Sequence, residues 1–380
     1  MVAENQLREG EMEDLVASAR RSIHKFLEMH SIAPYRPPLS GEFCLKRGCQ
    51  SPDLYGMADA VYVLYSLGEL AAWTSKASRA RWAARILSCQ DEKGWFTKNN
   101  EKGHPKEHAT AYAIGALRLL EVEEDEQYVA RLRPIDDLFP LLSEPSCVGQ
   151  WLERLDFRWH PGSVLRKNLG WHYIWRGSHN GGGVAATIGM LEGVINEVWR
   201  WKVDVEMWFQ SYFEWLDQHI DPETGYWQRA FWNSLWKRPT VVDMGGAAHF
   251  YWIYEAKMRP FPYPEAVIKS TLHLQKPNGL YKEKPFCVDL DGNFLLIRSY
   301  RQLTQDRQEI WREKVLAAVD RSAKTILQVL SGQKLEQIYS DLHSLPGAII
   351  GLIECSKADE TAWGEILSGW QHPLDRVMWL

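Results

Sequence analysis

The sequence predicts a single all-α domain with the architecture of an (α/α)6 toroid, a ring of six helical hairpins. Three observations predict this fold. An apolar segment with a polar head recurs six times, amphipathic segments separate the recurrences, and one turn pattern follows several of the amphipathic segments. We find no alternating polar and apolar pattern that would favour strands instead.

The recurring segments have the pattern of buried helices. Each opens on an Asp, His or Ser, as a helix start favours, and continues as an apolar run. Their starts lie roughly 45 to 70 residues apart, which leaves room for a helical hairpin and a loop. The six segments start at Asp53, His108, Ser178, Asp243, Asp289 and Asp341. We expect them to form the inner layer of the ring, with their heads at one mouth.

The segments between them carry their charges on one side and should form the outer layer. Residues 78–89 and 205–220 are two examples. Several of these helices should end in a turn of the form Gln-x-x-x-Gly-x-aromatic, as from Gln90 and Gln275, with a variant that starts at Asp221. We expect the glycine of each turn to adopt a left-handed C-cap conformation.

The length of 380 residues suits one such ring. We expect an N-terminal extension and a first outer helix over residues 1–48, the core ring over residues 49–355 and a C-terminal tail over residues 356–380.

Composition narrows the class of protein. Hydrophobic residues make up 45% and charged residues 24%, which is ordinary for a soluble protein with a large core. The net charge of −5 argues against a nucleic-acid partner. No apolar run is long enough to span a membrane, and the polar N-terminus does not resemble a signal peptide. We therefore expect a cytoplasmic protein and leave open a peripheral membrane contact and the oligomeric state.

Two residue types stand out by number. Six cysteines are too few for a disulfide framework, so we expect free thiols, including Cys44 and Cys49. Nineteen tryptophans are many, and more than half of them should serve packing. The others would suit a pocket for an apolar chain or a carbocation, or a surface that stacks on sugar rings.

The Gln-x-x-x-Gly-x-aromatic turns resemble the QW motif of squalene-hopene cyclases and related terpene cyclases. The same ring underlies the β subunits of protein prenyltransferases. The resemblance covers about residues 50–355, and single-domain class II terpene cyclases are the most similar in size. It implies an enzyme that cyclises an isoprenoid in a central cavity lined by aromatic side chains.

The acid motif of the cyclases is only partly present. Thr110-Ala111 and Ala116-Leu117 fit the continuation of their Asp-x-Asp-Asp-Thr-Ala motif, but His108 holds the place of the proton-donating Asp. An imidazolium is a much weaker acid than a carboxylic acid kept neutral in an apolar site, so His108 suits milder acid–base chemistry. If cyclisation is retained, another acid such as Asp59, Asp289 or Asp291 would replace it.

The zinc motif of the prenyltransferases is also incomplete. Asp291-Gly292-Asn293 is similar to their Asp-Gly-Cys step, with Asn at the thiolate position, and His343 lies in a helix head that resembles the one carrying their His ligand. The thiolate is the best zinc ligand of that set. We therefore expect no metal at these residues and no other cofactor.

Residues 168–183 concentrate His, Tyr, Arg and Asn next to three glycines that we expect to open a helix. Polysaccharide lyases on α/α toroids use such residues: an Arg or Asn neutralises a uronate carboxylate, and a Tyr or His takes the α-proton. Two alternatives are a packed helix N-terminus and an anion site. Residues 227–238 add aromatic residues and cations that would suit a sugar cleft, a pyrophosphate entrance or a polar loop.

Residues at the helix heads and in these motifs are the candidate site. The candidate catalytic residues are His108, Asp59, Asp289, Asp291 and His179. The candidate substrate-binding residues are Tyr55, Tyr112, Trp171, Tyr173, Arg176, Asn180, Trp232, Asp243, His249, Arg298 and His343. For any one of them, helix capping or packing is the simpler alternative.

Three functions remain open. The first is a non-standard terpene-cyclase-like enzyme acting on an isoprenoid. The second is a carbohydrate-active lyase, hydrolase or epimerase with His, Tyr and Arg in acid–base roles on a glycan. The third is a ring that binds a ligand without turnover.

Overall fold

The computed structural model describes residues 2–155, 171–227, 239–332, 334–358 and 361–380. Helices dominate these residues, no strand is formed among them, and isolated bridges join Ser31 to Phe43 and Gln90 to Phe96. This confirms the predicted all-α class. None of the described helices is both long and apolar enough to cross a membrane.

The chain divides into two compact units. Unit 1 is Met1–Trp82 with Thr271–Pro373, and unit 2 is Ala83–Ser270 with Leu374–Leu380. The C-terminal residues of the expected tail therefore belong to the same compact unit as the middle of the chain.

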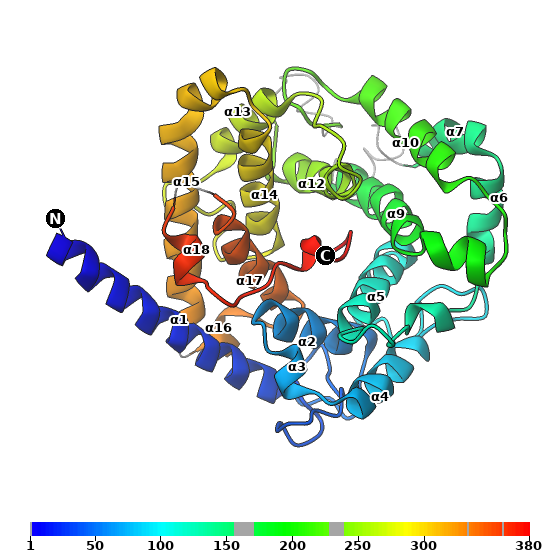
Figure 1. Ribbon diagram of the computed structural model, residues 1–380, viewed down its shortest axis with the longest axis horizontal. Helices are drawn as coiled ribbons and strands as arrows, with labels where there is room; N and C mark the ends of the chain where they lie inside the picture. The colour runs from blue at the N-terminus through cyan, green and yellow to red at the C-terminus, as the bar shows by residue number, and fades with distance from the viewer. Residues whose placement is uncertain (1, 156–170, 228–238, 333, 359–360) are drawn as a thin grey trace. The chain divides into compact units, whose positions relative to one another are not determined.

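Unit 1 contains two long helices and several short ones (Figure 1). Its helices are α1 (Val2–His30), α2 (Leu54–Ser66), α3 (Leu70–Trp73), α14 (Cys287–Arg301), α15 (Gln305–Ser331), α16 (Leu335–Ile338), α17 (Ser344–Cys355) and α18 (Trp363–Ile366). Helices α4 (Lys76–Leu87) and α13 (Pro264–Leu274) carry residues of both units.

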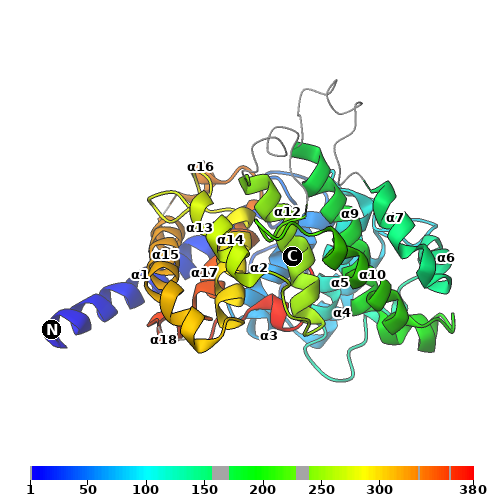
Figure 2. The same ribbon diagram turned by 90° about the horizontal axis from the view of Figure 1, so that it is seen from above.

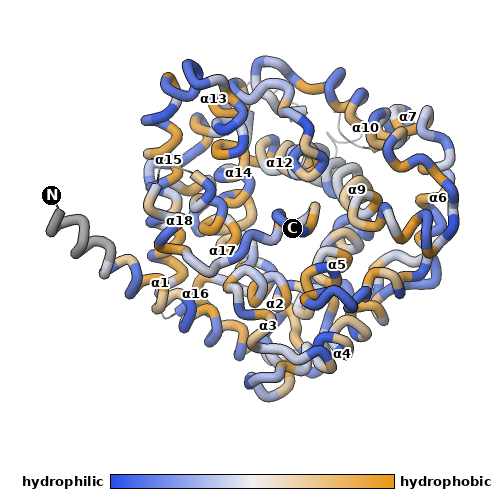
Figure 3. Tube along the Cα trace, viewed as in Figure 1, coloured by the Kyte–Doolittle hydropathy of each residue, from blue (hydrophilic) through white to orange (hydrophobic). Residues whose placement is uncertain are grey.

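The apolar helices of unit 1 pack in a row. Helix α17 contacts α2 on one side and α14 on the other, as Figure 1 and Figure 2 show. Helix α15 packs against both α14 and α17 and also contacts α1. Hydrophilic and hydrophobic residues alternate along α15 (Figure 3), as expected of a helix with one buried face. Within unit 1, α2, α17 and α14 thus form a row of apolar helices, and the amphipathic helix α15 packs against two of them.

Unit 2 repeats this arrangement with different helices. They are α5 (Lys106–Leu120), α6 (Phe139–Ser143), α7 (Val148–Arg154), α9 (Trp171–Met190), α10 (Val205–His219) and α12 (Val241–Ala256), with a π-helical turn at Val194–Val198 and 3-10 turns at Val129–Arg131, Asp136–Leu138 and Pro145–Cys147. Helix α9 lies between α5 and α12, and α10 contacts α9 and α7.

Two glycines bring the helices of this row close together. A Cβ atom on Gly183 would lie 2.8 Å from the backbone of Glu107 in α5. A Cβ atom on Gly182 would lie 2.8 Å from the Trp379 ring and 3.3 Å from the carbonyl oxygen of His249 in α12. Only glycine fits both positions without a shift of the neighbours. The residues beside these contacts, His108, His179 and His249, are held together as a result.

The predicted turns are formed in both units. Gly94, Gly225 and Gly279 have φ angles of 85°, 69° and 85°. The Gln90 amide donates to the Gly94 carbonyl at 2.7 Å, and the Gln275 amide donates to the Gly279 carbonyl at 3.0 Å. The left-handed conformation is thus confirmed. The expected C-cap position is wrong, because each glycine lies in a turn several residues beyond the last helical residue.

Most of the predicted helix starts are also wrong. Helices α5, α12 and α14 each begin two residues before the predicted His108, Asp243 and Asp289, and the starts of α9 and α17 differ by more. Helix α9 begins at Trp171 rather than Ser178, so its glycines lie inside the helix, where they serve packing. Helix α17 begins at Ser344 rather than Asp341, and the Asp341 carboxylate accepts the Ser344 backbone N–H at 3.1 Å. Asp53, by contrast, is the N-cap of α2 as predicted, with its side chain accepting from Gly56 at 2.8 Å.

The expected free thiols at Cys44 and Cys49 are a further error. A disulfide joins these residues, whose Cα atoms are 6.4 Å apart, within the span of such a bond. Sequence counting missed it because the pair closes one short local loop and belongs to no larger framework. Cys89, Cys147, Cys287 and Cys355 are free.

Candidate functional site

A buried carboxylate–histidine pair lies in unit 1. Asp59 of α2 is fully buried, and its Oδ1 atom lies 2.8 Å from Nδ1 of His343, the residue that precedes α17. The His343 side chain keeps 15% of its surface exposed. The Tyr55 ring meets the imidazole edge-on, with ring centroids 4.7 Å apart at 83°. The structure therefore brings together Tyr55, Asp59 and His343, three of the residues nominated from sequence.

This geometry fixes the state of the imidazole. A carboxylate at Nδ1 holds the proton on that nitrogen and leaves Nε2 as the atom that can accept or deliver a proton. Burial and the Asp59 charge raise the pKa of Tyr55 well above its ordinary value. Tyr55 thus stays a neutral phenol beside the pair.

Two further nominated acids of unit 1 differ from each other. Asp289 accepts the backbone N–H groups of Tyr281 at 2.9 Å and Phe286 at 2.8 Å, and burial nevertheless raises its pKa to about 7. Asp291 is fully buried, and neither of its carboxyl oxygens has a hydrogen-bond partner among the residues that the structure describes. Burial, with a smaller effect of Asp289, raises the pKa of Asp291 well above its ordinary value. Asp289 has a structural role, whereas Asp291 is a neutral acid.

Asn293 and Arg298 of α14 tie helices together. The Asn293 amide donates to Ser322 Oγ at 3.0 Å and to the Gly351 carbonyl at 3.1 Å, which joins α14 to α15 and α17. The Arg298 guanidinium donates to both carboxylate oxygens of Glu354, at 2.8 and 3.2 Å. We proposed Arg298 as a substrate ligand, and the structure places it in this buried ion pair.

A cluster of histidines lies in unit 2. The His108 ring is 4.5 Å from the rings of both His104 and His179, and His179 is 4.9 Å from His249. His108, His179 and His249 are buried, and His104 is half-buried. The nominated residues His108, His179 and His249 thus converge, and Tyr112 lies near them, 6.0 Å from His108.

Aromatic rings and one hydroxyl surround this histidine cluster. Trp379 lies 5.5 Å from His108 and 5.1 Å from His249, and Trp252 lies 4.9 Å from His249. The Ser178 hydroxyl donates to the Trp175 carbonyl and lies 2.9 Å from Nδ1 of His249. The Ser178 oxygen therefore accepts the His249 Nδ1 proton. Burial, with a smaller effect of His104, lowers the pKa of His249 to about 3, so this imidazole is neutral.

Other nominated residues of unit 2 have separate roles or positions. Asp243 accepts the Thr240 backbone N–H at 2.7 Å in a capping box at the start of α12. Asn180 is half-buried on α9, next to His179. Trp232 lies outside the described residues, as do the side chains of Trp171, Tyr173 and Arg176.

Sequence reasoning missed Trp379 and the pair formed by Glu354 and His372. Trp379 lies in the expected tail, where the short apolar run of residues 377–380 is the one local signal of burial. The His372 imidazole lies 2.8 Å from a Glu354 oxygen, and both side chains are buried. No spacing rule connects them, because one residue is on α17 and the other follows α18.

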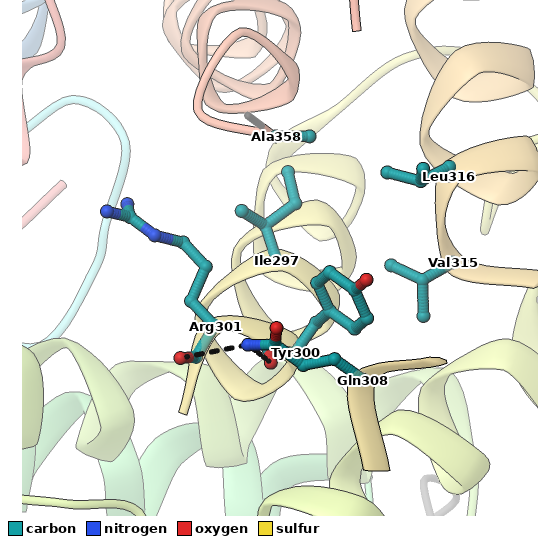
Figure 4. Close-up of a pocket in the computed structure, with 7 residues that line it drawn as sticks. All are labelled: Ile297, Tyr300, Arg301, Gln308, Val315, Leu316 and Ala358. Atoms are coloured by element: carbon teal, nitrogen blue, oxygen red, sulfur yellow. Dashed lines mark hydrogen bonds between the residues drawn. The ribbon is translucent and has the colours of Figure 1, made fainter. Parts of the chain in front are cut away.

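A small cavity at the C-terminal end of α14 is not a substrate site. It has a volume of about 70 Å³ and is lined by residues that include Ile297, Tyr300 and Gln308 (Figure 4). The Gln308 amide donates to the Tyr300 carbonyl at 3.2 Å and closes the helix end. Ligand pockets are usually about 300–1,000 Å³, so this space is too small for an isoprenoid or a glycan.

Comparison of the chain with protein-family models, with curated proteins and with solved structures found no match.

Proposed function

We propose that this protein is an enzyme of general acid–base chemistry in which His343 transfers the proton and Asp59 orients it. The observation that carries the proposal is the 2.8 Å contact between a fully buried carboxylate and an imidazole that keeps part of its surface exposed.

The strength of the base indicates the class of substrate. An imidazole oriented by a carboxylate is suited to remove a proton from carbon beside a carbonyl or carboxyl group. It is too weak an acid to protonate an alkene. Of the functions predicted from sequence, this favours the carbohydrate-active enzyme, a lyase or epimerase that takes the α-proton of a uronate.

The test is a panel of uronate-containing polysaccharides assayed for an unsaturated product by ultraviolet absorbance and for epimerised product by NMR. His343→Gln should abolish turnover. Asp59→Asn should lower kcat by about 10²- to 10⁴-fold, the usual contribution of a positioned acid–base group. His273→Gln, on α13, is a matched control and should leave turnover unchanged. Full activity in His343→Gln would contradict the proposal.

A second candidate is acid-initiated cyclisation of an isoprenoid, with Asp291 as the acid. It is favoured by a buried carboxyl group that remains protonated, which is the state that alkene protonation needs. We rank it second because both carboxyl oxygens of Asp291 are out of contact with solvent. Polyprenyl substrates would then be cyclised by the wild type and by His343→Gln, whereas Asp291→Asn would be inactive.

The proposal retains the predicted ring of six helical hairpins. Each unit supplies a row of three apolar helices, α2, α17 and α14 in unit 1 and α5, α9 and α12 in unit 2. Six is the number that the inner layer of such a ring requires. Small-angle X-ray scattering of the purified chain tests it, since a closed ring and two separated units differ in radius of gyration.

A further inference from the structure

We propose that His104 and His108 are ligands of a transition-metal ion, and the ligand type favours zinc. The inference concerns two histidines of unit 2. It also goes against the expectation from sequence that the chain holds no metal.

The positions of the two imidazoles carry the inference. His104 precedes Pro105, the N-cap of α5, and His108 lies in the first turn of that helix. Their rings are stacked at 24° with centroids 4.5 Å apart, and a ring nitrogen of one lies within 4.8 Å of a ring nitrogen of the other. Zinc holds imidazole nitrogens at about 2.0–2.1 Å, which places two ligating nitrogens about 3.3 Å apart. A modest rotation of the half-buried His104 ring closes the difference.

Neighbouring groups contact both rings and fix the backbone at His104. His179 meets both rings nearly edge-on, at 72° to His108 and 84° to His104. The Asn100 side chain donates to the His104 carbonyl at 2.9 Å and fixes the backbone there. Such neighbours orient metal-binding histidines before the ion arrives. We assign His179 a positioning role.

Charge and ligand type favour a borderline metal. The Lys106 ammonium, the cation between the two histidines in sequence, is directed to the Asp137 carboxylate at 3.0 Å and lies over the Trp95 ring at 4.2 Å. This ammonium group therefore contacts Asp137 and Trp95 rather than the two imidazoles. Neutral imidazoles suit zinc, copper, nickel and iron, whereas magnesium and calcium prefer oxygen ligands. Water or further side chains would complete the coordination.

The experiment is a titration of the untagged, chelator-treated full-length protein with Zn²⁺ against a chromogenic indicator, with Co²⁺ absorption spectra to report coordination. One ion should bind per chain. His104→Ala and His108→Asn should each weaken Zn²⁺ binding by more than about 100-fold, beyond the effect of removing a supporting residue. His179→Phe, which keeps a ring, should weaken it less. His219→Ala, whose imidazole bonds to the Trp215 carbonyl, is the matched control and should bind as the wild type does.

Alanine substitution of the remaining histidines, one at a time, then completes the ligand set. The inference is supported if Zn²⁺ affinity falls in the His104 and His108 variants, with or without a similar fall in one further histidine variant. It is overturned if the wild type binds no stoichiometric Zn²⁺, or if both variants bind as tightly as the wild type. Thermal unfolding of each metal-free variant, followed by circular dichroism, confirms that it is folded, and His104→Ala is the safest variant because His104 is half-buried.

Discussion

The Asp59–His343 pair of unit 1 and the histidine cluster of unit 2 place their imidazoles in opposite surroundings. In unit 1, His343 and His372 each lie 2.8 Å from a buried carboxylate, Asp59 and Glu354. In the cluster of unit 2, His179 and His249 lie against each other, His249 lies against Trp379, and the hydrogen-bond partner of His249 is a hydroxyl. A carboxylate partner favours the protonated imidazole, whereas an aromatic shell and burial favour the neutral one.

This difference separates two kinds of chemistry. An imidazole with a carboxylate at Nδ1 is prepared to exchange protons, as we propose for His343. A set of imidazoles that lie side by side can bind a metal ion, as we propose for His104 and His108. Each of the following predictions alters one side of this comparison or a feature that both units share.

The largest effect on stability should come from the ion pair of unit 1. Arg298→Met removes the partner that holds both Glu354 oxygens and leaves a fully buried carboxylate with His372 alone. Breaking a buried pair on one side costs about 3–5 kcal/mol. Urea unfolding should show this loss. Lys324→Met, in the exposed Lys324–Asp320 pair, is the control and should cost less than about 0.5 kcal/mol. Equal effects of the two variants would refute a structural role for the buried pair.

The stability that Glu354 contributes should be lost in a defined acidic pH range. Arg298 and His372 lower the pKa of Glu354 to about 2 from its ordinary value of 4.5, although burial opposes this. The unfolded chain therefore takes up a proton at higher pH than the folded chain. The stabilisation is complete above pH 4.5 and is lost as the pH falls towards 2. Unfolding free energies across this range should fall steeply for the wild type and less steeply for Glu354→Gln.

The histidine cluster of unit 2 should depend on one glycine contact. Gly183→Ala places a methyl group 2.8 Å from the Glu107 backbone and forces α9 away from α5. Overpacking of this kind costs about 1–3 kcal/mol, and Zn²⁺ binding should weaken with it. Gly193→Ala is the matched control, because nothing lies within 4 Å of its added methyl group. A Gly183→Ala protein as stable as the control would show that α9 and α5 do not pack as described.

Sequence reasoning could predict what depends on local pattern. Apolar periodicity located the helices, the cap at Asp53 fixed one helix start, and the turn motif predicted positive φ at Gly94 and Gly279. It misplaced the start of α9. Local preference alone places a run of glycines at a helix terminus, whereas their role in close packing can be recognised only when the neighbouring helix is known.

The candidate site could be predicted only in part, for the same reason. Asp59 and His343 were nominated separately, and their contact spans 284 residues, which no spacing within one segment reveals. The Arg298–Glu354 pair and the position of Trp379 are also products of packing between distant segments. Residue types in the sequence indicated which chemical groups are available, and the tertiary structure determined which of these groups are in contact.

Asp289 and Asp291 should respond differently to the same substitution. Asp289→Asn replaces one acceptor oxygen with a donor that faces a backbone N–H, which costs about 1–3 kcal/mol. Below pH 3.8, Asp291→Asn resembles the protonated acid of the wild type and should change the free energy of unfolding by less than about 0.5 kcal/mol. Urea unfolding of the two variants compares them directly.

The pH dependence sharpens that contrast. The pKa of Asp291 is raised in the folded state. Its contribution to the free energy of unfolding is therefore complete below pH 3.8, the ordinary pKa, and is lost as the pH rises through the pKa of the folded state. Asp291→Asn should therefore gain stability over the wild type at alkaline pH. A wild type that shows no such relative loss would mean that Asp291 has a charged partner.

A last pair of substitutions should have the same effect in both units, because it concerns the turn that they share. Gln90 donates to Gly94 and accepts the Arg133 backbone N–H at 3.1 Å in unit 2, and Gln275 donates to Gly279 and to the Ala318 carbonyl at 3.1 Å in unit 1. Each side chain thus closes its own turn and holds the next segment of its unit. Alanine at either position should cost about 0.5–1.5 kcal/mol for each hydrogen bond lost, measured by thermal unfolding. If only one substitution destabilises the chain, the two turns do not share a structural role, and the repeat that predicted the fold reflects sequence pattern alone.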